Sequence, residues 1–200
     1  EQTRIKICGL TRLEDIDAVN ELKPEYVGFV FAKSRRQITK EHAVTLRRYL
    51  DPEIQAVGVF VNELPAIVAG YLEEGVIDLA QLHGNESEEY IHSLRFRTGG
   101  ELIKAFSIKT REDVEKAKKS SADYILLDHG KGGTGESVDW SLIRNMDRPY
   151  FLAGGLNAEN VEQAILQTHP FAVDISSGVE TDGVKDPKKI TECIRRIRHV

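Results

Sequence analysis

Residues 102–128, with the sequence LIKAFSIKTREDVEKAKKSSADYILLD, set the architecture of this chain. The apolar runs at 102–107 and 122–128 have the length and the β-branched and aromatic content of buried strands. Between them, Thr110 and Asp113 have the spacing of a capping box, which predicts the start of a helix. A strand, a helix and a second strand in this order form one unit of a parallel sheet.

The same alternation covers the rest of the chain. Short apolar runs predict strands at 4–9, 26–31, 54–61, 78–84, 150–155 and 171–176. Segments of helical composition lie at 13–22, 40–50, 63–75, 86–96, 111–120, 139–146, 158–168 and 186–200. Eight strand–helix units without a linker predict an α/β fold, a single-domain (β/α)8 TIM barrel over residues 1–200. A doubly wound open sheet is the main alternative.

Composition and charge exclude several classes of partner. The chain has 200 residues, with 27 Lys and Arg against 32 Asp and Glu and a net charge of −5, which argues against nucleic acid. No apolar stretch approaches the roughly 20 residues that span a bilayer, so no membrane partner is expected. The first residues lack the apolar core of a signal peptide, and Cys8 and Cys193 make no disulfide framework. We therefore expect a cytoplasmic protein with a small-molecule ligand.

Cys8 ends the first predicted strand. Because side chains alternate along a strand, Ile5 and Ile7 are expected to face the helices, whereas Lys6 and Cys8 point into the barrel. A thiol near a cation can have a lowered pKa and act as a base or a nucleophile. A small buried hydrophobic residue is the alternative interpretation of Cys8.

Two more strand ends carry polar side chains at the face where (β/α)8 barrels place their active sites. Asp128 closes the sixth strand, where a carboxylate is costly to bury unless it is paired or faces a site; a capping role is the alternative. Gln81 and His83 end the fourth strand and suit a polar ligand, although His83 could bond the loop backbone instead. Lys104 has no evident partner that would lower its pKa, which disfavours Schiff-base chemistry.

The segment GKGGTG at 130–135 matches the dinucleotide-binding pattern Gly-x-Gly-x-x-Gly. It follows the sixth strand rather than the first, and the next helix starts too late for the last glycine to pack against that strand. We therefore interpret the segment as a glycine-rich flap over the site. No cofactor and no metal are expected, since the histidines and cysteines lack metal-ligand spacing.

Two glycine-containing loops follow the last two strands, LAGGLN at 152–157 and DISSGVE at 174–180. Small residues leave backbone N–H groups accessible, and (β/α)8 barrels commonly bind phosphate between these loops, so the pair predicts a phosphate site. After the second strand, AKSRRQ at 32–37 holds three cations. An arginine there can bind a carboxylate or a second phosphate, or the loop is only solvated.

Together these motifs resemble those of the phosphoribosylanthranilate isomerase family of tryptophan biosynthesis. The resemblance rests on KICGLT, VGFVF with KSRR, VGVFVN, QLHG, ILLD with GGTG and DW, LAGGLN and FAVDISSGVE, in this order along the chain. It implies an Amadori rearrangement of a phosphosugar, N-(5-phosphoribosyl)anthranilate, to 1-(2-carboxyphenylamino)-1-deoxyribulose 5-phosphate. A monomer or a homodimer is expected.

The resemblance also implies roles for the residues that match its motifs. Asp128 is expected to be the general acid, with a raised pKa, and Cys8 the general base, with a lowered pKa. Arg36 is expected to bind the anthranilate carboxylate, although Arg35 beside it leaves that choice open, and His83 to contact the substrate. The phosphate is expected on backbone N–H groups near a buried, orienting carboxylate: Gly154, Gly155, Ser177 and Gly178, with Asp174.

Two other functions remain open. A sugar isomerase of histidine biosynthesis on the same barrel would be expected to use two aspartates, and Cys8 at the first strand end speaks against it. A phosphosugar-binding barrel without catalytic activity is disfavoured by the presence of Cys8, Asp128 and Arg36.

Overall fold

Eight parallel strands close into a barrel in this computed structural model, which describes residues 1–129 and 140–200. The strands are β1 (Arg4–Cys8), β2 (Tyr26–Val30), β3 (Gln55–Phe60), β4 (Leu79–Leu82), β5 (Glu101–Ser107), β6 (Tyr124–Asp128), β7 (Tyr150–Ala153) and β8 (Ala172–Ile175). They pair in sequence order, and β1 closes the barrel by pairing with both β2 and β8. The predicted (β/α)8 barrel is confirmed, and the open sheet is excluded.

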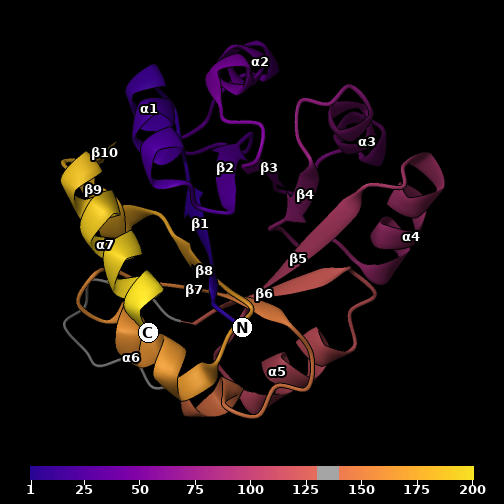
Figure 1. Cartoon of the computed structure of the whole chain (residues 1–200). Helices are drawn as coiled ribbons and strands as arrows, with labels where there is room; N and C mark the ends of the chain where they lie inside the picture. The colour runs from indigo at the N-terminus through magenta and orange to yellow at the C-terminus, as the bar shows by residue number, and fades with distance from the viewer. Residues whose placement is uncertain (130–139) are drawn as a thin grey trace.

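Seven α-helices surround the barrel among the described residues, as the view of Figure 1 shows. They are α1 (Leu13–Leu22), α2 (Lys40–Tyr49), α3 (Pro65–Glu73), α4 (Glu88–Arg97), α5 (Arg111–Lys118), α6 (Val161–Thr168) and α7 (Pro187–His199). The predicted capping box forms at α5: the Thr110 hydroxyl accepts from the Asp113 N–H, and the Asp113 carboxylate accepts from the Thr110 N–H. Apolar periodicity and caps therefore place nearly every element correctly.

The predicted helix at 139–146 is wrong. Within the described residues, this segment holds only a single turn of 3₁₀ helix, η1 (Ser141–Ile143). Pro149 precedes β7 directly, and the residue before a proline is restricted to extended conformations. A single turn of helix therefore forms between the buried Trp140 and the start of β7.

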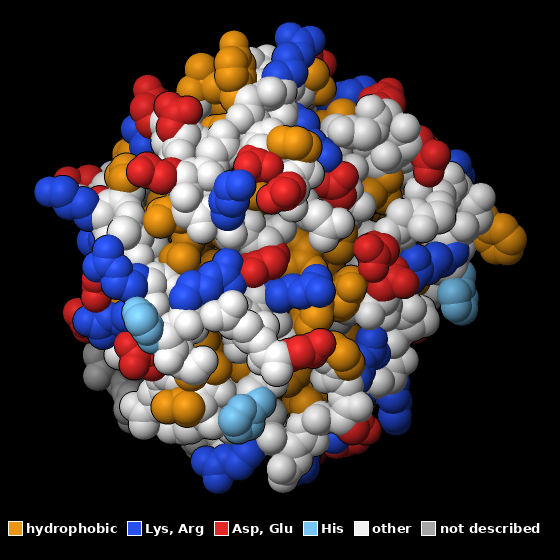
Figure 2. Space-filling view, viewed as in Figure 1, with side chains coloured by type: hydrophobic (Ala, Val, Ile, Leu, Met, Phe, Trp, Pro, Cys, Tyr) orange, Lys and Arg blue, Asp and Glu red, His pale blue; other side chains and the backbone are white. Residues whose placement is uncertain are grey.

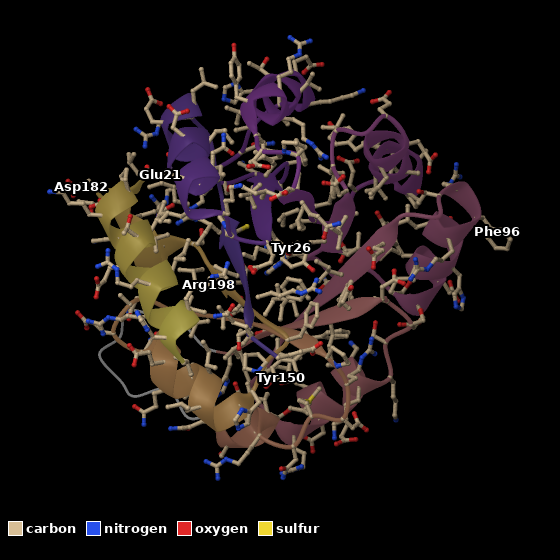
Figure 3. The ribbon with its side chains drawn as sticks, viewed as in Figure 1. Glu21, Tyr26, Phe96, Tyr150, Asp182 and Arg198 are labelled. Atoms are coloured by element: carbon tan, nitrogen blue, oxygen red, sulfur yellow. The ribbon has the colours of Figure 1, made fainter. Side chains whose placement is uncertain are left out.

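An unpredicted hairpin lies between β8 and α7. A short 3₁₀ helix, η2 (Ser177–Val179), leads into two antiparallel strands, β9 (Glu180–Thr181) and β10 (Val184–Lys185). Asp182 and Gly183 form the turn, both with positive φ, which is the conformation that an Asp-Gly hairpin turn adopts. Strands of two residues are too short to produce an alternating pattern, so the sequence did not predict this hairpin. Figure 3 shows its turn residue Asp182 at the outer edge of the molecule.

The core has two layers, one on each side of the strands. The outer layer, between strands and helices, contains Ile5 and Ile7, whereas the inner layer fills the barrel with side chains such as Leu126 and Phe151. Aromatic rings close the amino-terminal end of the barrel: those of Tyr26 and Phe151 lie 5.3 Å apart, and Tyr26 lies near the middle of Figure 3. Polar side chains are therefore left to the carboxyl end.

The surface shows no region of a single charge in the view of Figure 2, where basic and acidic side chains are interspersed between small hydrophobic areas. This mixture fits the small net charge, and the face seen in this view is not suited to a polyanion. None of the helices in the two described ranges is long and apolar enough to cross a membrane.

Candidate active site

The carboxyl ends of four strands bring ionisable side chains together inside the barrel. Lys6 and Cys8 come from β1, Asp174 from β8, His83 from the loop directly after β4, and Asp128 from the end of β6. The predicted alternation along β1 is confirmed, because Ile5 and Ile7 belong to the outer layer while Lys6 reaches across the barrel to β4 and β8. The site therefore begins where the apolar inner layer stops.

Lys6 connects the two sides of this site. Its Nζ atom donates to Asp174 Oδ2 and to Gln81 Oε1, each at 2.8 Å. The side chain is fully buried, and although burial lowers its pKa, the Asp174 carboxylate raises the pKa of Lys6 above its ordinary value. The amide Nε2 of Gln81 in turn lies 2.8 Å from Nδ1 of His83. The amide nitrogen can only donate, so His83 Nδ1 accepts, and the proton of the neutral imidazole is on His83 Nε2.

Cys8 lies almost completely buried beside Gly28, its partner in the β1–β2 ladder. A Cβ atom at position 28 would overlap the Cys8 sulfur, so the glycine makes the space for the thiol. Burial raises the pKa of Cys8, and the nearby Lys6 ammonium only partly opposes this. The predicted lowering of the Cys8 pKa is therefore wrong, because loss of hydration outweighs the neighbouring cation.

Asp128 and His83 face each other at the mouth of the barrel. Burial raises the pKa of Asp128, as predicted, although His83 partly opposes it. Asp128 Oδ2 lies 4.0 Å from His83 Nε2. Burial also lowers the pKa of His83, and the Lys6 charge adds to that. The carboxyl group therefore holds its proton more tightly than an ordinary aspartate, next to an imidazole that favours its neutral form.

Arg36 is fixed by a carboxylate on the hairpin. Its Nε and Nη2 atoms donate to the two oxygens of Glu180, at 2.8 and 2.7 Å, and Lys185 Nζ donates to the same carboxylate at 2.7 Å. Burial by itself would raise the pKa of Glu180, but these hydrogen bonds lower that pKa to about 2. Glu180 is thus an ionised anchor that orients the guanidinium of Arg36.

Arg35 and Arg36 occupy different places, although both contact Glu180. The Arg36 side chain lies over Gly9, the residue after Cys8, and only 21% of it is exposed. Arg35 extends over Gly183 at the hairpin turn, with 54% of its side chain exposed. Arg36 therefore lies over the residue next to Cys8, and its charge interacts with the thiol.

The loops after β7 and β8 are in contact, as the phosphate prediction requires. Gly154 and Gly155 both have positive φ, a conformation that favours glycine. A Cβ atom on Gly178 would overlap the carbonyl oxygen of Leu156, so only glycine allows the two loops to approach this closely. The N–H groups of Gly154 and Gly155 have no acceptor among the described residues, which leaves them for a ligand.

A cavity of about 590 Å³ opens over the ends of β4, β5 and β6, bordered by His83, Lys104 and Asp128 among others. Lys104 Nζ donates to Gly84 O at 2.8 Å and to Glu86 Oε1 at 3.2 Å, so this ammonium is held within the loop after β4. The predicted flap at 130–135 lies outside the described residues. Within the described ranges, no group of three or more acidic, histidine or cysteine side chains is placed to hold a metal.

Sequence reasoning missed the roles of Gly28, Glu180 and Lys185. A signal existed for Gly28, since it stands in the middle of a strand pattern, where glycine indicates a close approach. For the hairpin residues, Asp182-Gly183 was the signal, because that dipeptide predicts a tight turn between short strands.

A closed (β/α)8 barrel with a thiol, two carboxyl groups and an imidazole at its carboxyl end has the architecture of a barrel enzyme. Residues 5–196 match the family model described as N-(5'phosphoribosyl)anthranilate (PRA) isomerase. The chain therefore belongs to this family of intramolecular isomerases in tryptophan biosynthesis.

Individual relatives agree with this assignment. The N-(5'-phosphoribosyl)anthranilate isomerase of Clostridium acetobutylicum is 48% identical, with 98% of each chain covered. The crystal structure of phosphoribosyl anthranilate isomerase from Thermotoga maritima superimposes with a TM-score of 0.91 at 39% identity, over 100% of both chains. A structure of the isomerase in complex with reduced 1-(o-carboxyphenylamino)-1-deoxyribulose 5-phosphate gives 0.88 at the same identity and coverage. Monomers generated from the dimeric T. maritima enzyme give 0.87, also at 39% identity and full coverage.

Proposed function

We propose that Asp128 and Cys8 convert N-(5-phosphoribosyl)anthranilate to 1-(2-carboxyphenylamino)-1-deoxyribulose 5-phosphate by general acid–base catalysis. Protonated Asp128 donates to the furanose ring oxygen, and the ring opens to a Schiff base. The Cys8 thiolate then removes the C2′ proton, and the resulting enolamine tautomerises to the ketone. The observation that carries this proposal is that both groups stand at carboxyl strand ends of one barrel, where burial and, to a smaller extent, the charge of Asp174 raise the pKa of each.

Arg36 suits the anthranilate carboxylate. Nε and Nη2 of Arg36 donate to Glu180, while Nη1 has no partner among the described residues, and the side chain lies over Gly9, next to Cys8 in the chain. An oriented guanidinium loses little freedom on binding a carboxylate. His83, which faces Asp128 at the cavity, is proposed to contact the substrate beside the reacting ring.

The substrate phosphate is proposed to lie between the loops after β7 and β8, on N–H groups of Gly154, Gly155, Ser177 and Gly178. Support comes from the contact of these loops at Gly178 and from the positive φ of both glycines after β7. Asp174 Oδ1 is buried and has no hydrogen-bond partner in the described parts of the chain. A buried carboxylate oxygen in this state is suited to accept from a sugar hydroxyl.

The activity is tested directly by following the loss of phosphoribosylanthranilate fluorescence with the purified protein.

We propose further that the whole chain acts as one barrel domain, as a monomer or a homodimer, in the cytoplasm. The solved T. maritima relative described as dimeric supports the second form. The two cysteines are unpaired and buried, which suits a reducing compartment. Light scattering after size exclusion distinguishes the monomer from the dimer.

Replacing Arg36 by alanine is expected to raise KM about 10- to 100-fold with little change in kcat, because a hydrogen-bonded charge pair to the substrate contributes about 1.5–3 kcal/mol. Glu180 keeps Lys185 and Arg35 as partners, so the fold is retained. Steady-state kinetics measures the effect, and Arg35→Ala is the matched control, with a KM close to that of the unmodified protein. A raised KM in Arg35→Ala alone would transfer the role to that residue.

Replacing Gly28 by alanine is expected to reduce kcat about 100-fold, because the new methyl group displaces the Cys8 sulfur and a displacement of about 1 Å costs that much. Overpacking is expected to reduce the free energy of unfolding by about 1–3 kcal/mol. Gly70→Ala in α3 is the control, since a Cβ atom there meets no neighbour within 4 Å. A fully active Gly28→Ala variant would show that the exact place of the thiol does not matter.

A further inference from the structure

A buried lysine lies below the two catalytic groups and has no part in the steps above. The side chain of Lys6 is fully buried in a layer that is otherwise largely apolar. Its ammonium needs both Asp174 and Gln81 as partners, each at 2.8 Å. Replacing a buried ion pair by apolar side chains is often neutral or stabilising, so folding alone does not require a lysine here.

Contacts extend from Lys6 towards both catalytic groups. Lys6 and Cys8 are two residues apart on β1, so they point to the same side of the strand, with the thiol above. In the other direction, Gln81 joins Lys6 to Nδ1 of His83 at 2.8 Å, and His83 Nε2 lies 4.0 Å from Asp128 Oδ2. One ammonium thus stands at the centre of the site.

The proposed chemistry needs a proton on Asp128 and none on Cys8. The free protein favours the opposite arrangement, because the ordinary pKa of the thiol, 9.0, exceeds that of the carboxyl group, 3.8, and burial raises both. The productive form differs from the resting form only in which of the two groups holds one proton. Any charge that stabilises the thiolate therefore increases the fraction of productive enzyme.

We propose that Lys6 is a positioning residue that shifts this proton from Cys8 towards Asp128, by its charge on the thiolate and, through Gln81, on His83. This inference rests on the proposed function. Lys6, which folding alone does not require, thereby takes part in the reaction, and it acts through Cys8 and His83 rather than on the substrate itself.

Other charges act on the same two groups. Cys8 faces Lys6, Lys185 and Arg36, which favour the thiolate, and Asp174, which opposes it. Lys6 is the largest of the favourable charges on the thiol. His83 faces Lys6 and Lys104, which lower its pKa, and Asp128 and Asp174, which raise it. A neutral His83 leaves Asp128 able to stay protonated, so the charge of Lys6 acts in the same direction at both ends.

The test is the rate at which iodoacetamide alkylates Cys8 as pH is varied, in a Cys193→Ala background that leaves one thiol. Because only the thiolate reacts, Lys6→Met is expected to slow alkylation at neutral pH about tenfold or more. Asp174→Asn is expected to speed it, because the opposing charge is removed. The double variant Lys6→Met with Asp174→Asn leaves neither partner of this pair as an unpaired buried charge. Its alkylation rate is expected to lie between those of the two single variants.

Lys104→Met is the matched control, since this buried lysine pairs with Glu86 and is not among the charges that act on Cys8. Its alkylation rate is expected to equal that of the background. In Lys6→Met, kcat should fall in parallel with alkylation, and KM should change little. Alkylation rates that are equal in Lys6→Met and Asp174→Asn would overturn the role of Lys6 even if turnover falls. Full activity of a Cys8 variant would instead overturn the proposed function.

Discussion

Replacing Cys8 by serine is expected to reduce kcat/KM about 10²- to 10⁴-fold, the usual contribution of one positioned proton transfer. Serine is nearly the same size and fits the space beside Gly28, so the fold and substrate binding are retained. A serine hydroxyl does not ionise in the accessible pH range, so no base remains to remove the C2′ proton. The measurement is the rate of fluorescence loss of phosphoribosylanthranilate, with KM determined separately.

Cys193→Ser is the matched control for this variant. Cys193 is the other unpaired cysteine, it is buried in α7, and burial raises its pKa to about 12. The change is therefore expected to reduce stability slightly and to leave kcat/KM unchanged. Near-normal turnover in Cys8→Ser would remove Cys8 from the mechanism, whatever the result for Cys193→Ser.

The sequence predicts the position of a site residue wherever that position depends on a single strand. Alternation along RIKIC is enough to put Lys6 and Cys8 inside the barrel, because the side-chain period of a strand leaves no other choice. The end of β6 fixes Asp128 in the same way. The closeness of the two glycine-containing loops that we propose to bind the phosphate was predictable, because chain order in a (β/α)8 barrel places the last two strands side by side.

What depends on contacts between distant segments could not be predicted. The carboxylate of Glu180 meets Arg36 across 144 positions of the chain, and Lys6 meets Asp174 across 168. Nothing in one sequence gives those pairings until the barrel register is known. The same limit explains the wrong pKa direction for Cys8, since the cation beside it was visible in the sequence but the depth of its burial was not.

The two pKa directions together predict a bell-shaped dependence of kcat/KM on pH. The falling limb at high pH belongs to the group with the higher pKa, which is Cys8, and the falling limb at low pH to Asp128. Between them the number of bound protons is constant, so the productive fraction is constant too. Profiles of this shape report the pair rather than either residue alone, which is why single variants are needed to assign them.

Replacing Asp128 by asparagine is expected to reduce kcat about 10²- to 10⁴-fold, because the amide cannot protonate the ring oxygen that must leave. The size of the side chain is retained, so KM is expected to change little. Without the carboxyl group only Cys8 of this pair titrates, so the remaining activity should rise with pH through the pKa of the thiol and then level off, without the fall at high pH. Steady-state kinetics across pH measures both effects, and a variant that turns over normally with the bell-shaped profile intact would contradict the assignment.

The same variant is expected to be at least as stable as the unmodified protein at neutral pH. The pKa of Asp128 is raised in the folded state, so the folded protein binds a proton that the unfolded chain has released. Stability is therefore lost as pH rises from the unfolded pKa to the folded pKa, and it stays lower above that window. Asparagine carries no charge and escapes this loss. Thermal unfolding at acidic and neutral pH measures the difference, which should be larger at neutral pH; a lower Tm for Asp128→Asn at neutral pH alone would show that ionised Asp128 stabilises the fold instead.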